Sequence, residues 1–91
     1  MDIFVKIQIN MVSSIDSINI VLSNGYVKKG YGYTKVTKEN THWITFFDNS
    51  LQMYGYFTED EDFDKIYDTG IVNVSDSELE TLIKIFTKNY D

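Results

Sequence analysis

The chain contains no cysteine, arginine, proline or alanine, and its 91 residues include a single histidine, His42. Without cysteine it can form neither a disulfide nor a thiolate metal site. One histidine leaves too few imidazoles for most zinc sites and most acid–base arrangements. Without arginine, the bidentate recognition of phosphate or guanine by a guanidinium is not available. We therefore predict a protein that is not an enzyme, with no catalytic residues, metal or cofactor.

Long apolar segments are also missing. No stretch approaches the roughly 18 apolar residues of a membrane span, and the N-terminus lacks the apolar region of a secretion signal. The hydrophobic fraction of 43%, with fourteen aromatic residues, is enough to build a core without disulfides. The sequence thus predicts one domain, residues 1–91, in the cytoplasm.

Negative charge is what the sequence has in excess, and nearly all of it lies in residues 59–68. Six acidic residues and Lys65 give this segment −5 of the total formal charge of −6. The six acids are Glu59, Asp60, Glu61, Asp62, Asp64 and Asp68. Such a cluster favours a positively charged partner and disfavours direct contact with nucleic acid.

Apolar periodicity predicts the first elements. Strict alternation predicts a strand over residues 3–9, and helical spacing predicts a helix from residue 15 to Asn24 and Gly25, although residues 18–22 also fit a strand. Segments rich in Tyr, Val and Thr predict strands, with the last two joined as a hairpin. These segments are residues 26–36, 42–47 and 51–57. We expect them to form an antiparallel meander.

Two capping boxes predict helices in the second half of the chain. Thr58 and Glu61 predict a helix that ends at Gly70, and Ser75 and Glu78 predict the last helix. Residues 71–74 are a short strand at best. The predicted order is β-α-β-β-β-α-(β)-α. This is an α+β fold with an antiparallel sheet of three to five strands and two or three helices packed mainly on one face.

On the first of these helices, acids would line up at three- and four-residue spacing. Like charges at that spacing destabilise a helix by a few tenths of a kcal/mol per pair, a cost that a cationic partner would relieve. The stripe, Asp60, Glu61, Asp64 and Asp68, would imitate successive phosphates. The alternative is a solvated helix whose first-turn acids stabilise the helix dipole, which leaves Asp64 and Asp68 unexplained.

Asp60, Asp62 and Asp64 also copy the first, third and fifth positions of an EF-hand calcium loop. The sixth position of that loop requires glycine and the twelfth a bidentate glutamate. Here those positions hold Lys65 and Ile71. The pattern fails at both specific points, so no calcium site is predicted.

Residues 29–33, Lys-Gly-Tyr-Gly-Tyr, resemble the RNP1 motif of RNA-recognition domains, and residues 3–6 resemble its partner RNP2. The resemblance implies base stacking on the tyrosines. Two features depart from the family: Thr34 replaces a branched aliphatic residue, and the expected strand before RNP1 is missing. The acidic net charge also argues against RNA, because phosphate binding needs basic surface.

Two pairs of tyrosines are spaced to share strand faces: Tyr31 with Tyr33, and Tyr54 with Tyr56. If both pairs lie on the sheet face away from the helices, they form an aromatic patch. Tyrosine is a favoured anchor at protein interfaces, because its ring is rigid and its hydroxyl stays hydrated. Ordinary cross-strand packing is the alternative.

In size, acidity and codon bias, the chain resembles the small acidic phage proteins that inhibit bacterial host or defence enzymes, including anti-CRISPR proteins and other DNA mimics. The missing arginine, alanine and proline have GC-rich or partly GC-rich codons, whereas Ile, Asn, Lys and Tyr are abundant. This bias indicates an AT-rich genome, such as that of a low-GC bacterium or its phage. The resemblance implies a stoichiometric inhibitor, a monomer or homodimer, that binds the basic nucleic-acid channel of a nuclease or defence effector. The acids of residues 59–68 would contact this channel, with the four tyrosines as anchors.

Two further classes remain open. A ligand-sequestering protein would surround a phosphorylated molecule, such as a cyclic nucleotide, with tyrosines, His42 and the lysines. These lysines are Lys28, Lys29, Lys35 and Lys38. A generic protein-interaction module is the other possibility, and it would tolerate charge reversal in residues 59–68.

Overall fold

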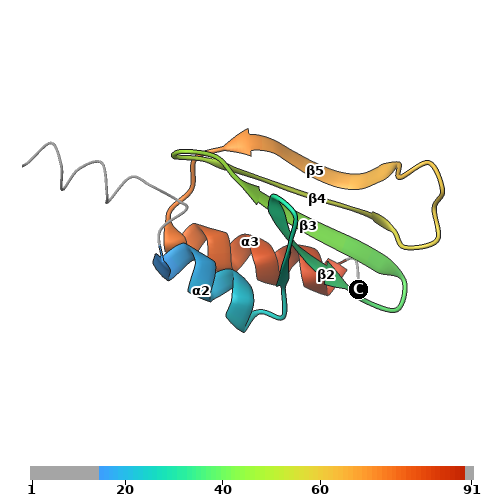
Figure 1. The fold of residues 1–91 in the computed structure, drawn as a ribbon, viewed down its shortest axis with the longest axis horizontal. Coiled ribbons are helices and arrows are strands. Elements are labelled where there is room, and N and C mark those ends of the chain that lie inside the picture. Colours follow the sequence, from blue (N-terminus) through green and yellow to red (C-terminus); the bar gives the residue numbers. More distant parts are fainter. Residues whose placement is uncertain (1–14, 90–91) are drawn as a thin grey trace, which may run out of the picture.

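Alternating apolar residues build a five-stranded antiparallel sheet in which every strand pairs with the next one along the chain (Figure 1). The computed structural model describes residues 15–89. The strands are β1 (Val27–Lys29), β2 (Gly32–Val36), β3 (Asn40–Phe46), β4 (Leu51–Phe57) and β5 (Lys65–Val72). The sheet is therefore a simple meander with β1 and β5 at its two edges.

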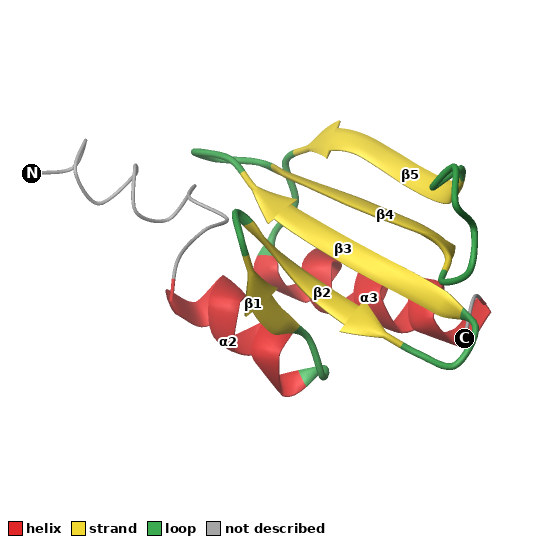
Figure 2. Ribbon diagram, turned by 45° about the vertical axis from the view of Figure 1, so that its right-hand side comes forward, coloured by secondary structure: helices red, strands yellow, loops and turns green. Residues whose placement is uncertain are grey.

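Two helices, α2 (Ile15–Ser23) and α3 (Asp76–Asn89), lie on the same face of this sheet (Figures 1 and 2). The predicted capping box is present at the start of α3: the Glu78 carboxylate accepts from the Ser75 backbone N–H at 3.0 Å, and the Ser75 hydroxyl accepts from the Glu78 N–H at 3.3 Å. The Ser17 hydroxyl of α2 donates to the Asp76 carboxylate at 2.6 Å, which joins the two helices.

The core lies between the helices and the inner face of the sheet. Inward side chains alternate along β4, where Leu51 and Met53 are fully buried and Gly55 follows them. The ring of Tyr67 stacks on Phe86 of α3 with 4.1 Å between centroids. The buried apolar set is Val21, Tyr26, Tyr33, Ile44, Leu51, Met53, Tyr67, Leu79 and Ile83. Each such side chain contributes about 1.5–3 kcal/mol on burial.

The predicted helix over residues 58–70 is wrong. Residues 58–64 instead form a loop with two turns, and the chain then enters strand β5. The Asp60 carboxylate accepts from the backbone N–H groups of Asp62, at 2.9 Å, and Asp64, at 3.3 Å. These bonds compete with helical hydrogen bonding, a known property of aspartate at turns.

Residues 26–36, predicted as one strand, form the hairpin of β1 and β2. Its two-residue turn consists of Gly30, with φ of 59°, and Tyr31. A positive φ at the first turn position suits the twist of a tight hairpin. The α+β fold with an antiparallel sheet and the helix beginning at residue 15 are confirmed, whereas the order over residues 15–89 is α-β-β-β-β-β-α. The predicted strand of residues 3–9 lies outside the described residues.

Candidate binding face

The outer face of the sheet, opposite the helices, presents aromatic side chains near one end. Because Met53 and Gly55 point inward along β4, Tyr54 and Tyr56 point outward, as the spacing predicted. Trp43 on β3 pairs with Tyr54 in the cross-strand register and stands on the same outer face. All three rings are half-buried.

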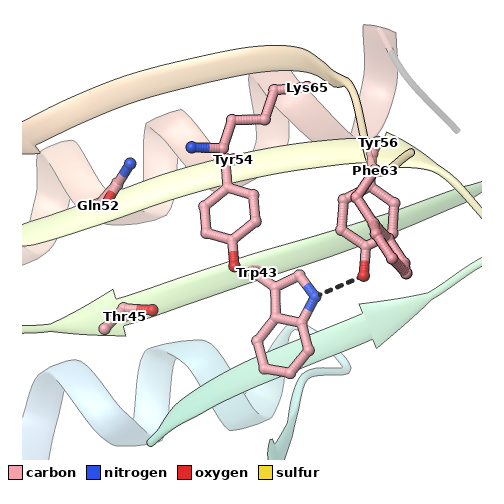
Figure 3. Close-up of a pocket in the computed structure, with 7 residues that line it drawn as sticks. All are labelled: Trp43, Thr45, Gln52, Tyr54, Tyr56, Phe63 and Lys65. Carbon is pink, nitrogen blue, oxygen red and sulfur yellow. Dashed lines mark hydrogen bonds between the residues drawn. The ribbon is translucent and has the colours of Figure 1, made fainter. Parts of the chain in front are cut away.

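These rings form the wall of an open groove of about 490 Å³ (Figure 3). The Trp43 indole Nε1 donates to the Tyr56 hydroxyl at 3.1 Å, which fixes the two rings relative to each other. Tyr54 and Tyr56 are near-parallel with centroids 6.5 Å apart. The groove is lined by Trp43, Thr45, Gln52, Tyr54, Tyr56, Phe63 and Lys65. We call this set the aromatic groove.

Lys65 places its ammonium over one ring of the aromatic groove. Its Nζ lies 4.9 Å from the centroid of Tyr54 and 3.3 Å from a carboxylate oxygen of Asp68. The pKa of the Tyr54 phenol is raised, chiefly by partial burial and then by Tyr56 and Asp68, while Lys65 opposes the shift. The ring faces of this groove are therefore compatible with a cation.

Asp68 differs from the other acids because its carboxylate is already bonded. It accepts from the Gln52 side-chain amide at 2.9 Å, from the Gly70 backbone N–H at 2.9 Å, and from Lys65. The Gln52 and Gly70 bonds, followed by Lys65, lower the pKa of this carboxyl below its ordinary value. Asp68 thus joins β4 to β5, although sequence reasoning placed it in the partner-binding set.

The remaining acids gather in the loop between β4 and β5, which we call the acidic loop (residues 59–64). It lies at one end of the sheet, beside the β2–β3 turn, where the Thr58 N–H donates to the Glu39 carbonyl at 2.8 Å (Figure 1). Within residues 15–89, four of its carboxylates accept no hydrogen bond and form no ion pair. They are Glu59, Glu61, Asp62 and Asp64, all exposed to solvent.

Phe63 connects the acidic loop to the aromatic groove. It lies between Asp62 and Asp64, has a positive φ of 55°, and its ring meets Tyr56 edge-on at 5.2 Å (Figure 3). Its side chain is 61% exposed, so this ring is part of the surface. Carboxylates and aromatic rings are therefore contiguous on one surface.

Asp60, Asp62 and Asp64 come close enough for one oxygen from each to lie within 4.8 Å of the others. Calcium takes six to eight oxygen ligands, so three exposed carboxylate oxygens do not build its site. Lys65 and Ile71, which stand where an EF-hand needs glycine and glutamate, belong to strand β5. These acids are better described as surface charge.

The predicted patch of four tyrosines is wrong for two of them. Tyr31 lies at the tip of the β1–β2 turn and is 98% exposed. Tyr33 points to the helices, is buried, and meets Phe46 edge-on at 5.7 Å, with Lys28 Nζ 5.1 Å from its ring. Tyr31 belongs to the turn and Tyr33 to strand β2, so they share no strand face. The RNP1-like arrangement of base-stacking rings is not formed.

The ligand-sequestering alternative involves His42 and four lysines, none of which lines the aromatic groove. His42 is fully buried on the helix side, and its Nδ1 lies 2.6 Å from the Tyr67 hydroxyl. Lys28 packs over Tyr33 on that same side, away from the aromatic groove. His42 is therefore a structural residue.

Sequence reasoning missed five members of the groove: Trp43, Thr45, Gln52, Phe63 and Lys65. The signal for Trp43 was present, because Ile44 alternates inward on β3 and leaves Trp43 outward beside Tyr54. No signal pointed to Phe63 or Lys65, since both were assigned to a helix that does not form.

Comparisons with known proteins give no match: no family model, curated protein or solved structure is similar to this chain. Neither of the helices in residues 15–89 has the length and apolar character needed to cross a membrane.

Proposed function

We propose that this protein is a non-enzymatic, stoichiometric inhibitor that binds the basic nucleic-acid channel of a host or defence enzyme by phosphate mimicry. The observation that supports the proposal is the acidic loop: five carboxylates in six residues, beside an exposed aromatic groove. In this proposal the protein acts in the bacterial cytoplasm, as anti-CRISPR-like phage proteins do.

The charge density of the acidic loop is comparable with that of nucleic acid. Six fully extended residues span at most about 20 Å, so five carboxylates give at least one charge per ~4 Å. A nucleic-acid strand bears one phosphate charge per about 3.4 Å. A channel evolved to hold one polyanion would therefore attract the other.

The acidic loop is also held in a defined shape. Asp60 bonds two backbone N–H groups of the loop, and Thr58 bonds the adjacent turn. A braced loop loses less conformational entropy on binding than a flexible acidic tail would. Its four free carboxylates remain available to lysine and arginine side chains of a partner.

Capture from a nuclease-treated lysate of a low-GC bacterium tests the proposal. The loop variant Glu59→Gln/Glu61→Gln/Asp62→Asn removes three charges and keeps the Asp60 bonds. The matched control Asp16→Asn/Asp48→Asn/Glu80→Gln removes three charges elsewhere. We expect wild type and control to capture the same nucleic-acid enzyme and the loop variant to lose it.

The captured enzyme is then assayed with increasing amounts of the protein. Stoichiometric inhibition predicts an endpoint near one inhibitor per active site, weakened as salt rises, because exposed charge pairs are screened. Equal capture by wild type and the loop variant, or inhibition that does not change with salt, would contradict the proposal.

A second candidate function is sequestration of a small planar anion, and Lys65 in the aromatic groove favours it. Aromatic rings stack on a nucleobase, and an ammonium binds its phosphate. Cyclic nucleotides at a hundred times their dissociation constant would raise stability by about 2.7 kcal/mol, which a thermal-shift series measures. This candidate requires binding that is lost in Lys65→Gln.

A further inference from the structure

We propose that the aromatic groove binds an arginine side chain from the basic surface of the partner. This inference rests on the proposed function and names the group that the partner inserts beside the acidic loop. The loop supplies electrostatic attraction at long range, and the groove supplies a specific contact.

The rings of the groove suit a planar cation. Trp43, Tyr56 and Phe63 surround an open space on the outer face, with Trp43 and Tyr56 locked by their hydrogen bond (Figure 3). A guanidinium stacks on such rings, and indole is the strongest partner among them. One ring face of the groove already holds a cation, because the Lys65 ammonium lies 4.9 Å from the centroid of Tyr54.

The charge around the groove selects a cation over an anion. Phe63 borders the groove, and its two sequence neighbours are the exposed carboxylates Asp62 and Asp64. The five acids of the loop outnumber the single lysine of the groove. The acidic loop disfavours a phosphate here, which sets this inference against the anion-binding candidate, whereas a guanidinium would gain both stacking and ion pairing.

Arginine fits this site better than lysine. Its guanidinium is planar and weakly hydrated, so it stacks on a ring while its N–H groups bond carboxylates beside it. The ammonium of lysine is a compact, strongly hydrated charge. The acidic loop alone does not distinguish the two, so a preference for arginine is a property of the groove.

Two peptides of equal charge test the inference: acetyl-(Gly-Arg)3-amide and acetyl-(Gly-Lys)3-amide. Trp43 is the single tryptophan of the chain, so its fluorescence reports on the groove directly. We expect the arginine peptide to bind roughly three- to tenfold more tightly and to change Trp43 emission. The lysine peptide should leave this emission unchanged.

Two exposed groove residues give variants that keep the fold. Phe63→Leu removes an exposed ring and should abolish the preference for arginine. Lys65→Gln removes a competing cation and frees the face of Tyr54, so it should tighten binding of the arginine peptide. Its ion pair with Asp68 is exposed and contributes little to stability.

Opposite results would overturn the inference. Equal affinities of the two peptides, both weakened by Glu59→Gln/Glu61→Gln/Asp62→Asn, would leave the proposed function standing and remove the groove from it. Weaker arginine binding by Lys65→Gln, or no binding of either peptide by folded protein, would also reject the arginine site. Loss of partner capture is judged separately and concerns the acidic loop.

Discussion

At the scale of single residues, Gly55 lies against the ring of Tyr67 with no room for a side chain. A Cβ added at Gly55 would lie 2.5 Å from a ring carbon of Tyr67. The Tyr67 ring cannot easily move, because it stacks on Phe86 and its hydroxyl bonds His42. Glycine on β4 is therefore a steric requirement of the packed layer above it.

We predict that Gly55→Ala lowers the free energy of unfolding by about 1–3 kcal/mol, the usual cost of overpacking. Urea denaturation followed by circular dichroism measures the change. Gly30→Ala is the comparison: it meets nothing within 4 Å, and its cost is the ~1–2 kcal/mol of a left-handed backbone. Since these costs overlap, a double-mutant cycle with Tyr67→Leu isolates the clash. Gly55→Ala should cost less stability in the Tyr67→Leu background than in wild type, and equal costs in both backgrounds would argue against the clash.

Asp68 links stability to pH. Because hydrogen bonds from Gln52 and Gly70 favour the carboxylate, its pKa is lower in the folded state than its ordinary value of 3.8. The stabilisation is present above pH 3.8 and is lost as pH falls through the lower folded pKa. We predict that Asp68→Asn, compared with wild type, shows a smaller loss of stability on acidification below that pH.

Urea midpoints of both proteins between pH 7 and pH 2.5 give this comparison. Asp48→Asn is the control, because Asp48 lies in the β3–β4 turn far from these bonds. If the stability difference between wild type and Asp68→Asn does not shrink on acidification, the bonds to Asp68 do not contribute in solution.

At the scale of elements, the acidic loop depends on one side chain. Asp60 accepts two backbone N–H groups and is the half-buried member of the loop. We predict that Asp60→Ala destabilises the protein by about 1 kcal/mol, while Asp62→Ala, which removes an unbonded carboxylate, does not. Hydrogen exchange at the N–H groups of residues 62 and 64 should accelerate in Asp60→Ala. Equal exchange in both variants would show that the loop keeps its shape without this bond.

The two capping boxes show what sequence could and could not predict. Ser75–Glu78 begins a helix because Leu79 and Ile83 follow at helical spacing and both are buried. Thr58–Glu61 matches the same pattern, but the apolar residues after it do not form one buried helical face: Phe63 is exposed, Ile66 is half-buried and Tyr67 is buried. A capping-box motif therefore predicted a helix correctly only where the residues after it bury one helical face in the core.

Strand β5 was hidden by its irregular pairing with β4. The register shifts between Gln52 and Tyr54, and again between Gly55 and Tyr56. Each shift breaks the two-residue alternation that reveals a strand, so the apolar residues of β5 imitate a helical spacing. At the first of these shifts, the Met53 backbone N–H donates to the Thr69 hydroxyl instead of to a backbone carbonyl of β5. No local sequence pattern predicts such a bond.

Only part of the candidate site could be predicted from the sequence, because strand alternation is a local pattern and the conformation of the acidic loop is not. The outward position of Tyr54 and Tyr56 follows from strict alternation in β4. The contact of Phe63 with Tyr56 depends on a positive φ in the loop, which sequence does not specify for phenylalanine. Charge could be counted from the sequence, but its meeting with the aromatic groove required the fold.

At the scale of the whole molecule, stability and the proposed binding face are separated. The helices and inner sheet face contain the buried set, while the acidic loop lies beyond the end of β4 (Figure 2). The four unbonded acids make no stabilising contact with residues 15–89, yet they repel one another. This repulsion lowers stability, a cost that the proposed binding function would explain.

This separation predicts that the loop variant Glu59→Gln/Glu61→Gln/Asp62→Asn is more stable than wild type. Removing three of five neighbouring charges should raise the free energy of unfolding by roughly 0.5–1 kcal/mol at low ionic strength, since two like charges about 4 Å apart in water repel by ~1 kcal/mol. The gain should shrink as sodium chloride rises from 50 mM to 1 M. At 1 M the Debye length is about 3 Å, so salt screens the repulsion between exposed charges.

Urea denaturation at both salt concentrations measures the gain, with Asp16→Asn/Asp48→Asn/Glu80→Gln as the control of equal charge. The control should gain less, since its acids are dispersed: Asp16 lies in the first turn of α2, where an acid is favourable, and Glu80 pairs with Lys84 at 3.8 Å. A loop variant less stable than wild type would mean that these acids support the fold. Its loss of partner capture would then reflect damage to the loop, and the acids would no longer be assigned to binding.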